Sequence, residues 1–330
     1  MNQARTTTRL SDSVIRTLGD AIAPRGAGEG RLCIVNYHRI LERPDPLLAS
    51  EPTVETFHWQ MELLASCFNV LPLHDALEML KAERMPPRAV AITFDDGYRS
   101  THDLALPVLQ QYQLPATVFV TTGHIDKGSM WNDVILEAAR RLPRGELELS
   151  DIGFGSYPLH TPQDRQNAVQ ALTERSKYLP PAGRAQLNHK LETLVGCSLE
   201  QELMLTRDML LALNRAGVEI GGHTITHPIL TCVDDATAQA EIAGNKQHLE
   251  SIIGKPVRLF AYPNGKQGID FDERHAQMVR EAGYSAAFTT AVGPVTRHTG
   301  RYTIPRSRPW DNHRMKFAGR LLYWLAGRAA

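Results

Sequence analysis

Short apolar runs alternate with longer segments of helical periodicity along most of this chain. Such runs, rich in Val, Ile, Leu and Ala, predict buried strands at 32–37, 89–94, 116–120, 218–222, 257–262, 285–289 and 302–304. Between them, apolar residues recur every three or four positions and predict helices at 54–68, 75–82, 101–112, 209–215, 234–253 and 272–282. Regular alternation of strands and helices is typical of a parallel sheet. The pattern therefore predicts an α/β fold with a barrel-like sheet.

The region from His124 to Leu205 interrupts this alternation. Its pattern predicts helices at 131–142, 161–178 and 184–195 and a small hairpin at 146–159. An insertion of this size over a barrel mouth commonly shapes the substrate cleft, and a solvent-facing decoration is the alternative. We expect an N-terminal helical extension (1–30), a central catalytic domain (31–310) with an insertion at about 124–205, and a C-terminal tail (311–330).

Amphipathic segments occur near both ends of the chain. Apolar residues at helical spacing in 10–22 predict a helix that packs on the barrel exterior, followed by a glycine-rich joint at 26–30. The tail is basic, and its apolar residues lie among Arg and Lys side chains. This composition suits either packing on the barrel or peripheral contact with a membrane surface.

Two of the predicted strands end in polar side chains suited to metal chemistry. The strand at 89–94 runs into Asp95-Asp96-Gly97, and the strand at 218–222 runs into His223 and His227. Because parallel strands place their carboxyl ends at one edge, we expect these groups to meet. Two imidazoles and one carboxylate suit Zn²⁺ or a similar divalent ion, and a cation relieves repulsion between neighbouring carboxylates. A surface turn with structural histidines is the alternative.

These residues carry a resemblance to a known family. The sequences Thr93-Phe94-Asp95-Asp96-Gly97 and His223-Thr224-x-x-His227 resemble the first two motifs of the polysaccharide deacetylases, carbohydrate esterase family four. The likeness is strongest to the exopolysaccharide-type members and spans about 31–309. It implies a distorted (β/α) barrel and a metal-dependent hydrolase that removes acetyl groups, chiefly N-acetyl, from a sugar, oligosaccharide or polysaccharide. Asp96, His223 and His227 would hold the metal, Zn²⁺ first with Co²⁺ or Ni²⁺ as alternatives, and Asp95 would be the base.

The resemblance also implies an oxyanion donor and a general acid. In the third family motif the donor follows a proline, and Pro263-Asn264 stands at that place, so the backbone N–H of Asn264 is assigned. The family uses a histidine near the last strands as the acid. His298 and His313 are both candidates, although neither lies in a recognisable form of that motif. His38, just after the first strand, is expected to border the cleft in a supporting role.

One departure from the family pattern leads to a specific prediction. The third motif of the family carries an arginine directly after the aromatic residue, whereas Phe260 is followed here by Ala261. Arg258 is a poor replacement, because side chains alternate along a strand and Arg258 faces away from the Ala261 side. We therefore expect Arg306, with Arg308 as second choice, to reach Asp95 from the end of the last strand. Two surface arginines are the alternative interpretation.

Composition and charge limit the kinds of molecule that this protein is expected to bind. The 36 basic and 36 acidic residues cancel, which argues against a nucleic-acid partner. The four cysteines lie far apart, as is typical of thiols in a reducing compartment, and two disulfides are the alternative. The first residues show neither an apolar signal region nor a membrane span. We expect a cytoplasmic protein, or one peripheral to the membrane, that acts on an acetylated sugar precursor or polysaccharide. Two alternatives are a related C–N hydrolase, such as a deformylase of a lipid-linked aminosugar, and a sugar-binding scaffold without catalysis.

Overall fold

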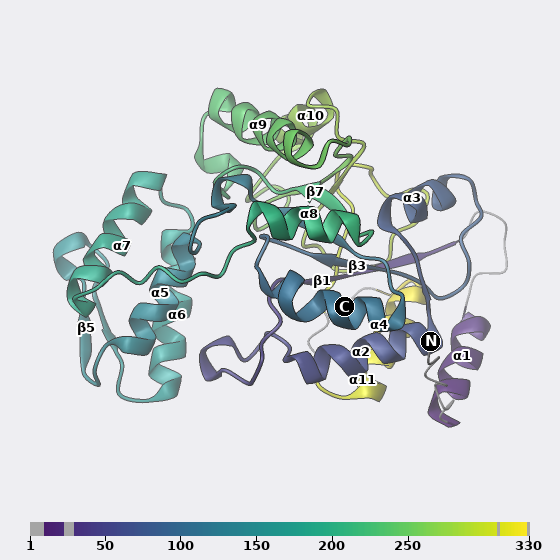
Figure 1. Ribbon diagram of the computed structural model, residues 1–330, viewed down its shortest axis with the longest axis horizontal. Coiled ribbons are helices and arrows are strands. Elements are labelled where there is room, and N and C mark those ends of the chain that lie inside the picture. The colour runs from purple at the N-terminus through teal and green to yellow at the C-terminus, as the bar shows by residue number, and fades with distance from the viewer. Residues whose placement is uncertain (1–9, 23–29, 309–310, 329–330) are drawn as a thin grey trace.

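The computed structural model describes residues 10–22, 30–308 and 311–328 and shows a curled parallel sheet with helices packed around it (Figure 1). The chain start and most of the predicted joint at 26–30 lie outside the described residues. The main sheet follows the order β1-β3-β4-β7-β8-β9, with β2 beside β3. Its strands are β1 (Leu32–Tyr37), β2 (Asn69–Val70), β3 (Ala89–Phe94), β4 (Thr117–Val120), β7 (Glu219–Gly222), β8 (Leu259–Ala261) and β9 (Ala286–Phe288). The predicted α/β barrel is confirmed.

A short extended segment at 304–307 lies between β9 and β1 and brings the ends of the sheet together. Ile304 forms a parallel bridge with Phe288 of β9, and Ser307 forms one with Val35 of β1. The predicted strand at 302–304 is therefore present only as isolated bridges. Pro305 has no N–H to donate, so a continuous ladder cannot form here. The segment nevertheless carries Arg306 to the interior of the barrel, where it is 2% exposed.

The helices around the sheet match the predicted ones closely. They are α1 (Leu10–Ile22), α2 (Val54–Cys67), α3 (Leu73–Lys81), α4 (Leu106–Tyr112), α8 (Arg207–Arg215), α9 (Asp235–Ile253), α10 (Glu273–Glu281) and α11 (Arg314–Leu325). The predicted helix at 101–112 begins instead as a wide π-helical turn, Thr101–Ala105, before α4. Pro107 lies at the start of α4 and cannot donate to the preceding turn, which explains the irregularity.

The insertion forms a lobe beside the barrel, seen at the left of Figure 1. It contains α5 (Trp131–Arg141), α6 (Pro162–Ser176), α7 (Pro181–Val195) and the antiparallel pair β5 (Glu146–Glu148) and β6 (Ser156–Pro158). The lobe has its own apolar core, to which Ile135, Leu147, Leu172 and Leu187 contribute. The predicted hairpin and helices of this region are confirmed.

The C-terminal helix packs on the barrel. Phe317, Leu321 and Trp324 of α11 are at most 3% exposed and belong to the main core, together with Ile15 of α1. Arg314 is held by ion pairs with acidic residues of α1 and α2. These three apolar side chains of the tail are therefore covered by the fold, whereas Met315 and Tyr323 of the same helix are 54% and 42% exposed, and peripheral membrane contact stays a prediction. Among the described residues, no helix combines the length and apolar character needed to cross a bilayer.

Candidate active site

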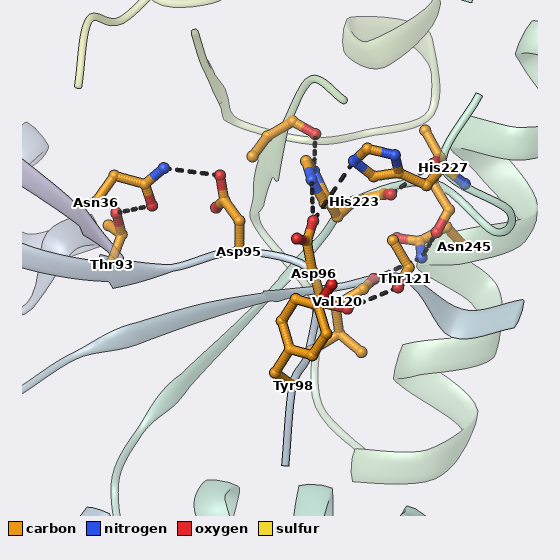
Figure 2. Close-up of polar contacts among 12 residues, drawn as sticks. Asn36, Thr93, Asp95, Asp96, Tyr98, Val120, Thr121, His223, His227 and Asn245 are labelled. Carbon is orange, nitrogen blue, oxygen red and sulfur yellow. Dashed lines mark hydrogen bonds and ion pairs between the residues drawn. The ribbon is translucent and has the colours of Figure 1, made fainter. Parts of the chain in front are cut away.

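The motif residues meet at the carboxyl ends of β3 and β7 (Figure 2). One carboxylate oxygen of Asp96, Oδ1, lies 3.3 Å from Nε2 of His223 and 3.5 Å from Nε2 of His227. The three ligand atoms lie within 4.8 Å of one another. The predicted grouping of these side chains is confirmed, and the donor set of one carboxylate and two imidazoles fits Zn²⁺ or a neighbouring divalent ion.

The protonation of the two imidazoles also suits metal binding. Nδ1 of His223 lies 2.7 Å from the carbonyl oxygen of Ala261, which can only accept a hydrogen bond. We therefore assign a hydrogen to Nδ1, which makes Nε2 the atom that would bind a metal; burial lowers the pKa of His223, but without an ion its hydrogen bond with Asp96 outweighs this effect and raises the pKa. Burial lowers the pKa of His227 to about 3, so this imidazole is neutral at pH 7. Nε2 of each ring therefore faces Asp96, at the place where a cation would bind.

The ligands sit on strained backbone at the ends of the strands. Asp96 has φ of +71°, His227 of +56° and Thr224 of +65°, all in the left-handed region. For residues with a Cβ this conformation costs about 1–3 kcal/mol each. Such turns persist only where the surrounding structure fixes them. Here they redirect the chain sharply after the strand, and this places the ligand side chains over the sheet edge.

Helix α9 holds the loop between the two histidines in this conformation. Glu241 accepts hydrogen bonds from the backbone N–H groups of Ile225 and Thr226, at 2.7 and 2.8 Å. Asn245, one turn further along α9 and fully buried, donates to the carbonyl oxygen of Thr224 at 2.5 Å. Three consecutive loop residues are thus held by two side chains of one helix face. The sequence analysis did not identify these two residues.

Asp95 is held by a bidentate ion pair with Arg306, as predicted. Its Oδ1 lies 2.6 Å from Nη1 and its Oδ2 lies 2.8 Å from Nη2, and both residues are 2% exposed. Asn36 of β1 donates a further hydrogen bond to Oδ2 at 2.9 Å. Burial raises the pKa of Asp95, but the charge of Arg306 outweighs this effect and lowers the pKa to about 2. Asp95 is therefore an oriented, ionised carboxylate at pH 7. Arg308 instead pairs with Glu51 at 2.6 Å.

These groups open into a cavity of about 520 Å³. Besides the motif residues it is lined by Asn264 after β8 and by Met130, Trp131, Asn132 and Thr173 of the insertion. The insertion thus borders the cleft, as expected from its position in the sequence. The backbone N–H of Asn264 makes no hydrogen bond with the described residues, which leaves it available as a donor. Its role at an oxyanion stays a prediction.

The positions of the histidines require a correction. His298 is exposed and follows Val295, which pairs with Leu32 at the amino end of β1, so it lies at the opposite end of the barrel from the cavity. His313 precedes α11, is exposed and does not line the cavity. Neither can serve as the predicted acid in this structure. His38 does line the cavity, because β1 pairs with β3 along its whole length and ends beside it.

Comparison with known proteins agrees with this geometry. A family model described as polysaccharide deacetylase matches residues 82–287. The poly-beta-1,6-N-acetyl-D-glucosamine N-deacetylase of Staphylococcus epidermidis is 30% identical over 140 residues, which cover 38% of this chain and 48% of that protein. The chain spans about half the length of the staphylococcal relatives that it matches.

Solved structures share the fold at low sequence identity. IcaB from Ammonifex degensii gives a TM-score of 0.58 at 18% identity and covers 90% of this chain and 98% of its own. The Streptococcus pyogenes deacetylase PplD, in complex with acetate, gives a TM-score of 0.57 at 17% identity. The match covers 85% of this chain and 92% of that one. The family match extends over more than half of the chain and includes both motifs that form the metal cluster. The chain therefore belongs to the polysaccharide deacetylase family.

Proposed function

We propose that this protein is a metal-dependent hydrolase that removes N-acetyl groups from an aminosugar oligosaccharide or polysaccharide. The observation that carries the proposal is the placement of the Asp96, His223 and His227 cluster beside the ionised, oriented Asp95 in one cavity. The name of the staphylococcal relative, an N-deacetylase of an N-acetylglucosamine polymer, supports the choice of N-acetyl over O-acetyl.

Each residue of the site has a separate role in the proposed reaction. Asp96, His223 and His227 would hold a divalent ion, which supplies Lewis acidity that polarises the acetyl carbonyl and makes water more acidic. Asp95 takes the proton of the attacking water, and Arg306 keeps the carboxylate ionised and in position. The Asn264 N–H faces the developing oxyanion.

We assign His38 to the leaving amine in place of His298 and His313. It lines the same cavity as Asp95 and Asp96, whereas the other two lie outside it. Its Nδ1 is buried and finds no hydrogen-bond partner among the described residues. A His38→Gln variant should retain bound metal and lose at least about tenfold in kcat, since general acid catalysis contributes roughly 10²–10⁴-fold. Unchanged turnover would remove His38 from the mechanism.

Metal analysis combined with a substrate panel tests the proposal. Purified protein should contain one divalent ion per chain, lose activity on chelation and regain it with Zn²⁺, Co²⁺ or Ni²⁺. Acetate should be released from N-acetyl sugars faster than from O-acetyl sugars. Faster release of formate from N-formyl sugars would instead favour the deformylase alternative. A protein that binds sugars but hydrolyses none of them would be the scaffold.

A further inference from the structure

Basic side chains converge on the active-site cavity from four separate segments. They are Lys177 after α6, Lys266 after β8, Arg308 after the closing segment at 304–307, and Arg320 of α11. Among the described residues, the acids that line the cavity are Asp95 and Asp96 alone. Asp95 is already paired with Arg306, and Asp96 would be occupied by the metal. The chain as a whole is neutral, so this excess of positive charge is local.

The counter-charges of these cations lie outside the cavity wall. Arg308 pairs with Glu51, Arg320 with Asp311 and Lys177 with Glu174, and none of the three acids lines the cavity. Lys266 is exposed and forms no ion pair with any described residue. A cavity with cations on its wall and acids behind them attracts anions, because low-dielectric walls focus the field into it.

The remaining wall suits a sugar ring. Trp131, which is partly exposed, and Val292, which is 47% exposed, line the same cavity. Aromatic faces pack against the apolar faces of sugar rings, and a few polar groups among apolar ones set the specificity of a small-molecule site. The wall therefore matches a ligand that combines pyranose rings with negative charge.

We infer that the substrate is an anionic aminosugar, in which the acetylated unit or the unit joined to it carries a carboxylate or a phosphate ester. This inference rests on the proposed deacetylase function and names its substrate class. Lys266 lies two residues beyond Asn264, on the turn that would face the reacting carbonyl, so it is placed to meet an anionic group close to the acetamide. Lys177 approaches from the insertion lobe on the same side, since Tyr178 and the Lys266 backbone both bond to Asp270.

Three matched substrates test the inference. They are an N-acetylglucosamine disaccharide, its counterpart with glucuronic acid as second sugar, and its counterpart with a phosphate monoester on the second sugar. Acetate release should show kcat/KM at least about tenfold higher for one or both anionic substrates at 50 mM salt. Raising the salt to 500 mM should lower only the anionic values, because screening weakens attraction between charges. The ratio between the two anionic substrates identifies the carboxylate or the phosphate as the preferred group.

A pair of lysine variants locates the effect. Lys266→Gln removes a wall cation but keeps the contact of its backbone N–H with Asp270, at 2.8 Å. It should lower the anionic-to-neutral ratio of kcat/KM about fivefold. Lys255→Gln is the matched control, since Lys255 is exposed in the loop before β8, at the far end of the strand, and it should leave the ratio unchanged. Equal kcat/KM for all three wild-type substrates, without salt dependence, overturns the inference while leaving the deacetylase function intact. Absence of acetate release from every N-acetyl sugar refutes the proposed function itself.

Discussion

Replacing Arg306 by methionine removes the partner of a buried carboxylate while keeping an apolar side chain of similar length. Asp95 and Arg306 are each 2% exposed, so water in the cavity can replace only a small part of the lost interaction. Breaking a buried ion pair from one side costs about 3–5 kcal/mol, because the remaining charge is left without compensation. We expect Arg306→Met to lose this much unfolding free energy in the metal-free protein. The double variant Asp95→Asn/Arg306→Met should lose clearly less, since no uncompensated charge remains.

Equilibrium unfolding in urea, followed by tryptophan fluorescence, measures these differences. Arg308→Met is the control, because the Arg308 side chain is 34% exposed and its pair with Glu51 should contribute less than about 1 kcal/mol. A second check is pH. A folded pKa of about 2 lies below that of an unfolded aspartate, so the pair stabilises the fold above about pH 4 and its contribution is lost as pH falls toward 2. The difference in unfolding free energy between wild type and Arg306→Met should therefore decrease as the pH falls over that interval. Strictly additive single and double variants would refute the coupling between these residues.

Three further predictions concern the ligands, their support and the tail. Asp95→Asn should keep metal content and lose most turnover, whereas Asp96→Asn should lose metal itself, as metal analysis of both variants will show; an equal loss of metal in both contradicts the division of roles. Asn245→Ala should weaken metal affinity by more than about tenfold, because the Thr224 carbonyl loses its hydrogen-bond donor. Titration with Co²⁺, followed by absorption, measures this affinity. Unaltered affinity would mean that the histidine loop keeps its conformation without Asn245. Deleting 313–330 should lower thermal stability severely, since the deletion exposes core residues that contact Phe317, Leu321 and Trp324; a truncated chain that melts like the full one rules out the packing role of α11.

The site residues that directly follow a predicted strand could be identified from the sequence. The sequence places the metal ligands and the base directly after apolar runs: Asp95, Asp96, His223 and His227. Parallel strands bring their carboxyl ends to one edge of the sheet, so these side chains are expected to lie together. Arg306 was predictable because the family's arginine is missing after Phe260, alternation along that strand excludes Arg258, and Arg306 follows the last predicted strand. His298 was misplaced because the spacing of short segments near the end of the chain does not reveal which end of the barrel a loop occupies.

Other parts of the site carried a weaker signal. Asn36 lies within the otherwise apolar strand at 32–37, and a polar side chain inside a buried strand indicates an internal partner, which is Asp95. Glu241 and Asn245 gave no such sign, because polar residues on a helix that contacts solvent are ordinary. Only the packing of α9 against the histidine loop reveals their role.

The closing segment at 304–307 links catalysis to completion of the fold. Every proposed metal ligand, and Asn264, precedes Arg306 in the chain, so a nascent polypeptide emerging from the ribosome presents the ligands before the guanidinium that orients the base. Until Ile304 and Ser307 bridge β9 and β1, Asp95 lacks its cation. Chain synthesis thus produces the metal-ligating residues first and the partner of the base last, so Asp95 can be oriented only after the closing segment has joined the barrel.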